Sequence, residues 1–347
     1  MKSIYSATQD ELLELTLSSG EKKFRLTQLN EWLFKRFAYS WEDMNNIPAA
    51  YRAALAERYY SLKETLEIIE VAKDPATKTK KLLSRLHDGE LIETVIIPSK
   101  TRNTICISSQ AGCACGCVFC ASGMNGWTRN LELGEIFGQV ILAARELGEK
   151  PDNIVFMGVG EPFNNYDNAI GAAKLLNSGP PVGLGIGARK ITISTCGIVP
   201  GIKRFAEEGF QFELSVSLHA PNNMLRDQIM PINKRWKIDE LMATCREYEE
   251  KTNRIITFEY TLVDGVNNAR KHADELIARL RGLKCKVNLI PLSPVPEYPG
   301  KTPSEQNCEQ FGAYLLSHGI NTTLRRSKGK SVNGACGQLR RQAAPKE

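Results

Sequence analysis

Three cysteines on one short segment set the strongest limit on what this chain can bind and how it can fold. Cys113, Cys117 and Cys120 form a C-x₃-C-x₂-C array inside the stretch CISSQAGCACGCVFCASGMNG, which begins at Cys106 and ends at Gly126. Thiolate sulfur is a soft ligand that suits iron, and three thiolates on one loop can hold three corners of a cubane iron–sulfur cluster. The fourth iron of such a cluster has no protein ligand, so it can bind a molecule that reacts there.

Other interpretations of these cysteines compete with a cluster. Cys115 lies inside the array, so four cysteines could form a structural zinc site. Zinc sites usually pair two C-x₂-C elements from separate segments, and this sequence has one such element. A disulfide framework is disfavoured because four cysteines fall within eight residues. The spacing therefore favours a cluster on the three cysteines of the array, with Cys115 pointing away from it.

The residues around the array identify a family. An aromatic residue, Phe119, precedes the last cysteine, and further motifs are FMGVGEPFNN at 156–165, SLHAPNNMLRDQIMPIN at 217–233 and ACGQL at 335–339. Together with CISSQAGC, they resemble the adenine-C2 RNA methyltransferases of the radical S-adenosylmethionine (SAM) superfamily, over essentially the whole chain. Those enzymes methylate carbon 2 of an adenosine in the peptidyl-transferase centre of 23S ribosomal RNA. Some members also methylate an adenosine next to the anticodon of transfer RNA.

Short apolar strands alternate with helical patterns from residue 104 onward. The expected strands read TICIS, NIVFMG, KITIST, FELSVSL, IITFEYTLV and CKVNLIPL, and the expected helices cover 132–148, 167–177, 199–209, 238–252, 269–282 and 304–318. This alternation predicts an α/β fold with a parallel sheet and crossover helices. Six units are too few for a closed eight-fold barrel. The resemblance implies a partial (β/α)6 barrel, with the chemistry on loops at the C-terminal strand ends.

The first part of the chain has a different character. Residues 8–60 have apolar positions at helical intervals, and residues 64–97 contain strand-like pieces with a hairpin turn at Asp88-Gly89. We therefore expect a small N-terminal domain of helices and a hairpin, residues 1–98. The barrel and a C-terminal loop with a catalytic cysteine then occupy residues 99–347. The resemblance implies that the N-terminal domain is an accessory unit that contacts RNA.

The charge of the chain fits a polyanionic partner without requiring one. Lys and Arg number 45 against 39 Asp and Glu, so the net charge is 45 − 39 = +6. The basic residues gather in two clusters, one of Lys73, Lys78, Lys80, Lys81 and Arg85 and one of Arg325, Arg326, Lys328 and Lys330, with Arg340 and Arg341 beyond. Either cluster alone would be read as a solvated face. Beside an RNA-modifying signature, both are expected to contact phosphate groups.

Nothing in the sequence predicts a membrane protein or a secreted one. No run of about 18 apolar residues occurs, and the first residues, MKSIYSATQDELLEL, include acidic residues where a signal peptide requires apolar ones. We expect a cytoplasmic protein. In that compartment its ten cysteines are metal ligands, redox groups or buried thiols rather than a disulfide framework.

The segment after NIVFM suits a bound cofactor. Glycines allow a close approach to the backbone, and a carboxylate accepts hydrogen bonds from an ammonium group. The resemblance implies that SAM binds the open iron of a [4Fe–4S] cluster through its amino and carboxylate groups. It assigns protein contacts with SAM to Gly160, Glu161, Ser194, Ser217, Leu218, His219 and Asn288.

Cys106 and Cys336 complete the chemistry that the resemblance implies. Carbon 2 of adenine is electron-poor and is no nucleophile, so the family uses two SAM molecules per turnover. Cys336 takes a methyl group from the first, and a 5′-deoxyadenosyl radical from the second removes a hydrogen atom from that methyl group. The resulting methylene radical adds to adenine. Cys106 then attacks the sulfur of Cys336, which releases methylated RNA and leaves a disulfide between the two cysteines.

The remaining expectations concern a base, the other cysteines and the partners. Glu93, in LIETVIIP, resembles the proton acceptor of the family, although one polar residue on an apolar strand also fits an ordinary exposed face. The cysteines expected to be structural are Cys196, Cys245, Cys285 and Cys308. The expected partners are 23S ribosomal RNA, transfer RNA and a flavodoxin-like electron donor, and the protein is expected to be a monomer without membrane contact.

Two alternative functions compete with carbon-2 methylation. Sister enzymes on the same scaffold methylate carbon 8 of the same ribosomal adenosine and confer antibiotic resistance. They share the cysteines, and Pro162 after Gly160-Glu161 favours the carbon-2 group. A non-enzymatic RNA-binding protein with a zinc knuckle would use the array alone and would leave Cys106 and Cys336 without a purpose.

Overall fold

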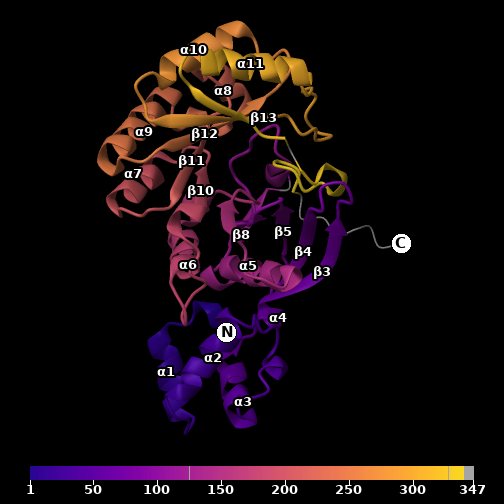
Figure 1. The fold of residues 1–347 in the computed structure, drawn as a ribbon, viewed down its shortest axis with the longest axis vertical. Helices are drawn as coiled ribbons and strands as arrows, with labels where there is room; N and C mark the ends of the chain where they lie inside the picture. Colours follow the sequence, from indigo (N-terminus) through magenta and orange to yellow (C-terminus); the bar gives the residue numbers. More distant parts are fainter. Residues whose placement is uncertain (125, 327, 340–347) are drawn as a thin grey trace.

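One open sheet carries most of the chain, and the computed structural model describes residues 1–124, 126–326 and 328–339 (Figure 1). The sheet has ten strands in the order β14-β13-β12-β11-β10-β9-β6-β5-β4-β3. Its edge strands, β14 (Asn321–Leu324) and β3 (Leu66–Lys73), do not pair with each other. The barrel is therefore incomplete, and the predicted α/β partial barrel is confirmed.

The parallel part of the sheet is built from strand–helix units. Each strand pairs in parallel with the next in the series, and a helix connects them. The strands before β14 are β6 (Asn103–Cys106), β9 (Asn153–Phe156), β10 (Ile191–Thr195), β11 (Glu213–Ser217), β12 (Ile256–Leu262) and β13 (Cys285–Pro291). The connecting helices are α5 (Leu133–Leu147), α6 (Tyr166–Asn177), α7 (Val199–Glu207), α9 (Ile238–Thr252), α10 (Arg270–Leu280) and α11 (Glu305–Ser317). All six expected units are present.

Several short elements were not predicted from the sequence. They are β1 (Lys2–Ser3), β2 (Tyr59–Tyr60), α4 (Leu62–Thr65), β7 (Gln110–Gly112), β8 (Trp127–Asn130), α8 (Asn223–Ile229) and the edge strand β14. Each is seven residues or shorter, and a segment of that length has too few positions to display a clear period.

Three antiparallel strands extend the sheet beyond β6. They are β3, β4 (Lys80–Leu86) and β5 (Leu91–Pro98), and the predicted turn at Asp88-Gly89 joins the last two. Gly89 has a φ of +91°, which a residue with a Cβ rarely adopts. β5 then pairs with β6, with Val95 opposite Cys106. The hairpin is thus continuous with the barrel sheet, and the division of the chain after residue 98 stays a prediction.

The N-terminal helices form a group at one end of the molecule, far from α9, α10 and α11 (Figure 1). They are α1 (Gln9–Ser18), α2 (Phe24–Phe34) and α3 (Ala49–Arg58). The segment that follows them packs closely on α5, where a Cβ on Gly138 would lie 2.6 Å from Leu66 Cδ1. One continuous apolar core joins this group to the barrel. None of the described helices is long and apolar enough to span a membrane.

Gln139 connects α5 to the segment that leads into the cysteine array. Its side chain is buried, and its Oε1 accepts hydrogen bonds from the Ser108 amide at 2.8 Å and from Thr94 Oγ1 at 3.0 Å. Its Nε2 donates to the Ser108 carbonyl oxygen at 2.9 Å. The backbone just after β6 is therefore fixed by one amide side chain before the array begins.

Arg226, in α8, is fully buried and ties together the ends of two strands. Its Nη2 donates to the carbonyl oxygens of Cys196, after β10, at 2.6 Å and of Ser217, in β11, at 3.1 Å. Its Nε donates to Leu218 O at 3.2 Å and its Nη1 to Asn233 Oδ1 at 3.0 Å. Buried carbonyl groups need a donor, so this one side chain fixes the loops that follow β10 and β11 relative to each other.

Replacing Arg226 by Met should destabilise the fold. Three buried acceptors and the half-buried Ser217 carbonyl oxygen would lose this donor, and each unsatisfied buried group costs about 1–3 kcal/mol. We expect the free energy of unfolding to fall by at least about 3 kcal/mol, measured as a lower urea midpoint by circular dichroism. Arg235→Met is the matched control, because Arg235 is exposed and surface substitutions change stability by about 0.5 kcal/mol or less. Equal midpoints for the two variants would contradict this role.

Candidate functional site

A cavity lies at the C-terminal ends of the parallel strands. Its volume is about 950 Å³, counting its open mouth, and its wall includes residues at or just after the ends of β9, β10 and β11, residues of β12 and β13, the cysteine array and the C-terminal segment. Most of the predicted site residues line it: Cys113, Cys117, Cys120, Gly160, Glu161, Ser194, Ser217, His219 and Cys336. The other predicted residues do not line this cavity. They are Leu218, which is fully buried, and Cys106, Glu93 and Asn288.

The array is held in a loop between β7 and β8. The Cys113 amide donates to the Gly126 carbonyl oxygen at 3.0 Å, and the Cys120 amide donates to the Cys117 carbonyl oxygen at 3.1 Å. All three thiols of the array are half-buried. Burial raises the pKa of Cys117 and of Cys120, and coordination to a metal removes a thiol proton even in such surroundings. Three free thiols that face one cavity fit a [4Fe–4S] cluster with one open iron.

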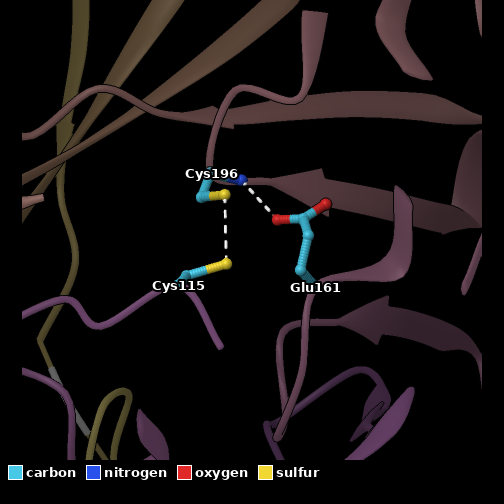
Figure 2. Close-up of side chains that lie close together, drawn as sticks. All are labelled: Cys115, Glu161 and Cys196. Atoms are coloured by element: carbon cyan, nitrogen blue, oxygen red, sulfur yellow. Dashed lines mark hydrogen bonds between the residues drawn. The ribbon is translucent and has the colours of Figure 1, made fainter. Parts of the chain in front are cut away.

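Cys115 does not point away from the site, contrary to the expectation from the sequence. Its Sγ lies 3.4 Å from Cys196 Sγ, and both residues line the cavity (Figure 2). Cys196, expected to be structural, is therefore a wall residue too. The sequence carries no signal for this pairing, because the two cysteines are 81 positions apart and meet only once β10 is in the sheet.

Glu161 places a buried carboxylate in the cavity wall. The preceding Gly160 has a φ of +106°, and a Cβ there would lie 2.6 Å from Gln110 Cβ. Oε1 of Glu161 accepts from the Phe163 amide at 3.0 Å, and Oε2 accepts from the Cys196 amide at 2.6 Å. Burial raises the pKa of this carboxyl group. No basic side chain of the described residues contacts it, so a cationic ligand here would gain a buried counter-charge.

His219 presents a neutral imidazole to the cavity. Its Nδ1 accepts a hydrogen bond from the Thr261 amide at 2.9 Å, and its ring meets the Phe119 ring edge-on with 5.0 Å between centroids. Burial, with a smaller contribution from the charge of Arg226, lowers the pKa of His219 to about 3. The ring is therefore neutral at pH 7 and carries its proton on Nε2, because Nδ1 is an acceptor. Nε2 is the ring nitrogen that can donate to a ligand.

Glu259, in β12, adds a second buried carboxylate that the sequence analysis missed. Its Oε1 accepts from Ser215 Oγ at 2.9 Å and from Asn288 Nδ2 at 3.0 Å, and its Oε2 lies 3.6 Å from Arg325 Nη1. Asn288 thus does not line the cavity itself but donates a hydrogen bond to a wall residue, Glu259. A lone acidic residue in the apolar run IITFEYTLV is the signal that could have indicated it.

A second cavity of about 1,120 Å³ contains Cys106 and Cys336 in its wall. Cys106 ends β6 and is buried, whereas Cys336 is exposed on the C-terminal segment and also lines the first cavity. The Ala121 amide donates to the Gly337 carbonyl oxygen at 2.6 Å, which holds this segment against the cysteine array. Burial raises the pKa of Cys106 to about 12, the charge of Cys336 adds to the rise, and Arg325 opposes it.

Glu93 lies in β5 outside both cavity walls. Its side chain is 1% exposed, and its Oε1 lies 2.7 Å from Lys81 Nζ. Side chains two positions apart on a strand share one face, so Glu93 lies on the same face as Val95. Val95 packs with Cys106 and Leu339. Glu93 is therefore on the same face of the sheet as Cys106.

The first basic cluster is largely paired within the protein. Besides Lys81, Lys80 Nζ lies 3.3 Å from Glu146 and Arg85 Nη1 lies 3.2 Å from Glu67. These pairs leave fewer free charges for phosphate groups than the sequence alone indicates.

The second basic cluster borders the cavity that holds Cys106 and Cys336. Arg325, Arg326 and Lys328 line it, and Arg102, which the sequence analysis did not single out, joins them. Arg326 pairs with Glu305 at the surface. Arg340 and Arg341 lie outside the described residues.

Comparison with known proteins agrees with this geometry. The profile of the Radical SAM superfamily matches residues 107–277, and that of the ribosomal RNA large subunit methyltransferase N-terminal domain matches residues 3–60. A probable dual-specificity RNA methyltransferase RlmN from Clostridium novyi (strain NT) is 44% identical over 98% of this chain and 98% of its own length. The corresponding protein from Geobacillus kaustophilus (strain HTA426) is also 44% identical, over 100% of this chain and 94% of its length.

A solved structure has nearly the same fold. The crystal structure of a radical SAM methyltransferase from Sphaerobacter thermophilus superimposes with a TM-score of 0.94 at 43% identity, over 99% of this chain and 100% of that one. The three array thiols in one cavity, the shared fold and the full-length similarity lead to one conclusion. The chain belongs to the RlmN family of radical SAM RNA methyltransferases.

Proposed function

We propose that this enzyme methylates carbon 2 of an adenosine in the peptidyl-transferase centre of 23S ribosomal RNA and of an adenosine next to the anticodon of transfer RNA. One observation carries the proposal. Cys336 lines both cavities, the one with the cysteine array and the one with Cys106. A thiol in that position can take a methyl group on one side and deliver it to RNA on the other.

The first cavity would hold the cofactors. Cys113, Cys117 and Cys120 would hold the [4Fe–4S] cluster, and Glu161 would accept hydrogen bonds from the ammonium group of SAM. When bound, the cluster would supply the one-electron chemistry: an electron for reductive cleavage of SAM to a 5′-deoxyadenosyl radical, and an acceptor for the electron that the RNA adduct must lose. The Nε2–H of His219 is placed to donate to the cofactor from the same wall.

Cys336 would carry the methyl group. Its sulfur takes the methyl of a first SAM, and the methyl then loses one hydrogen atom and bonds to carbon 2 of the adenine. Cys336 is exposed, and Gly337 beside it has a φ of +80°, so the segment bends where few other residues fit. Adenine must be unstacked to reach this sulfur, so a loop or bulge of RNA is the expected target.

Cys106 would release the product. Its sulfur attacks the sulfur of Cys336, a disulfide forms, the bond from sulfur to the methylene carbon breaks, and that carbon takes a proton to become methyl. With a pKa of about 12, Cys106 is a neutral thiol at pH 7, so it must lose its proton before it attacks. The nearby Arg325 stabilises the thiolate once its proton is removed.

The RNA would enter over the second cavity. Arg102, Arg326 and Lys328 border it, and cationic side chains there would contact phosphate groups. Residues 1–98 are proposed as an accessory unit that assists RNA binding. A flavodoxin-like electron donor and a monomeric enzyme complete the proposal.

The nucleoside product tests the proposed carbon atom. Reconstituted enzyme, SAM, a reductant and a fragment of 23S ribosomal RNA or a transfer RNA should yield 2-methyladenosine, identified by mass spectrometry of the digested nucleosides. 8-Methyladenosine would support the rival reaction at the same scaffold. Cleavage of SAM without any methylated adenosine would show that neither RNA is the substrate.

Variants of Cys336 and Cys106 should stop the reaction at different steps. Cys336→Ala should abolish both methylation and crosslinking to RNA, because no sulfur carries the methyl group. Cys106→Ala should trap the covalent RNA adduct, because nothing breaks the bond from Cys336 sulfur to the methylene carbon. Denaturing gels with labelled RNA measure the adduct, and Cys285→Ala is the control, because Cys285 lines neither cavity. Release of free methylated RNA by Cys106→Ala would count against the scheme.

Glu93 is proposed as the acceptor of the proton from carbon 2, with Lys81 holding its carboxylate in place. Glu93→Gln should lower turnover by about 10²–10⁴-fold, the usual contribution of a general base. Methyl transfer to Cys336 needs no such base, so the mass of the Cys336 peptide should still rise by one methyl group. Unchanged turnover in Glu93→Gln would exclude this role, and loss of methyl transfer to Cys336 would indicate a structural one.

A further inference from the structure

Two cysteines outside the catalytic scheme meet in the wall of the first cavity. Cys115 Sγ and Cys196 Sγ are 3.4 Å apart, and the residues are 6% and 7% exposed (Figure 2). Neither belongs to the C-x₃-C-x₂-C array, and neither is Cys106 or Cys336. They form a thiol pair that the proposed methylation does not use, and the Cys115 thiol also makes a hydrogen bond with the thiol of the array residue Cys113.

Both members of the pair are held in place by other interactions. The Cys196 amide donates to Glu161 Oε2 at 2.6 Å, and the Cys196 carbonyl oxygen accepts from Arg226 Nη2 at 2.6 Å. Cys115 lies between array residues Cys113 and Cys117, so its backbone position is set by the loop that holds the cluster. A pair fixed in this way loses little conformational entropy when its sulfurs bond.

We propose that Cys115 and Cys196 are an oxidation site, which closes to a disulfide when SAM is absent from the cavity. A disulfide bond has a length of about 2.05 Å, so the two sulfurs, which are 3.4 Å apart, need to approach each other by about 1.35 Å. The bond would tether the array loop to the end of β10, beside the Glu161 carboxylate. It is distinct from the Cys106–Cys336 disulfide of turnover.

The oxidant is a low-molecular-weight disulfide. One cysteine thiolate attacks a sulfur of that molecule, which breaks its S–S bond and releases one small thiol. The other cysteine then attacks the resulting mixed disulfide and releases the second small thiol. The two protein thiols lose two electrons and two protons in total, and the small disulfide gains them.

The cavity provides the route to the pair. Both cysteines are buried except where they line the cavity that SAM is proposed to fill. Bound SAM should therefore exclude the oxidant. This dependence on SAM rests on the proposed function, whereas the closing of the pair does not.

The test uses anaerobic, cluster-reconstituted enzyme and 4,4′-dithiodipyridine as the small disulfide. After treatment, free thiols are alkylated and trypsin fragments are analysed by mass spectrometry. Cleavage at Arg102 and Arg129 and at Lys190 and Lys203 gives fragments 103–129 and 191–203. We expect these fragments to be linked without SAM and unlinked with saturating SAM. The iron and sulfide content should be unchanged in both samples.

Variants assign the link to its two sulfurs. Cys115→Ser and Cys196→Ser should each abolish it, whereas Cys245→Ser, which removes another buried cysteine from α9, should retain it. A link that persists in Cys115→Ser would show that another cysteine of fragment 103–129 reacts, and a link that forms with loss of iron would show that an array cysteine reacts. Either result would overturn the proposal. The proposal would also be overturned if 4,4′-dithiodipyridine left the extent of Cys196 alkylation unchanged.

Two further outcomes separate this proposal from its rivals. Cys115, Cys196 and Glu161 have ligand atoms within 4.8 Å of one another and could instead hold a soft divalent ion. One zinc per chain that survives dialysis in the wild type but not in Cys115→Ser would overturn the oxidation site. A link that forms equally with and without SAM would overturn its dependence on an empty cavity. Failure of methylation in enzyme that links as expected would count against the proposed function alone.

Discussion

The buried guanidinium of Arg226 is the interaction on which the rest of the site depends. Parallel strands in one sheet bring their C-terminal ends to one edge, but the loops that leave those ends have backbone carbonyls without a partner in the sheet. Arg226 collects the carbonyls of Cys196, Ser217 and Leu218. Its position fixes where the loop after β10 and the loop after β11 stand, and therefore where Cys196 and His219 face the cavity.

The charges of the first cavity favour a cationic ligand. Glu161 and Glu259 are both buried in its wall, and Arg325 is the basic residue among the lining residues. Arg325 lies 3.6 Å from Glu259, and the charge of Cys336 raises the pKa of Arg325. The charge of Arg325 is thus balanced by Glu259. Glu161, in contrast, has no cationic partner among the described residues. SAM is a sulfonium with an ammonium group, and it would supply the charge that the cavity lacks.

The sequence predicted those parts of the structure that depend on local pattern. The six strand–helix units follow from the alternation of apolar strands and amphipathic helices, and the turn at Asp88-Gly89 follows from residues that suit a tight reversal. The array cysteines follow from their spacing and Cys336 from its motif. What could not be predicted depends on contacts between distant segments. Cys115 meets Cys196 across 81 positions, and nothing in either local sequence distinguishes this pair from Cys245 or Cys308.

The same distinction explains the ion pairs. The cluster of Lys73, Lys78, Lys80, Lys81 and Arg85 was expected from the sequence to contact phosphate groups. In the structure, three of its members, Lys80, Lys81 and Arg85, each have an acidic partner. Two of those partners are on other strands, and Glu146 is in α5. A run of basic residues in a sequence shows the charge of the segment but not which acidic residues lie near it in space. Only the folded structure distinguishes a paired cation from a free one.

The placement of Cys336 outside the barrel core has a physical reason. In the proposed mechanism the Cys336 sulfur meets SAM, adenine and Cys106 in turn, so it cannot sit on a rigid strand, because these three groups cannot occupy one position. Among the described residues, the C-terminal segment packs on the sheet through Leu339, beside Val95 and Cys106, and it also makes the Ala121–Gly337 and Ser122–Leu339 hydrogen bonds. These two hydrogen bonds reach past the sheet. Both attach it to the loop of the cluster cysteines rather than to the sheet. A shift of that loop would therefore move the segment that carries Cys336, so under the proposed mechanism the state of Cys115 bears on Cys336 as well as on the cluster.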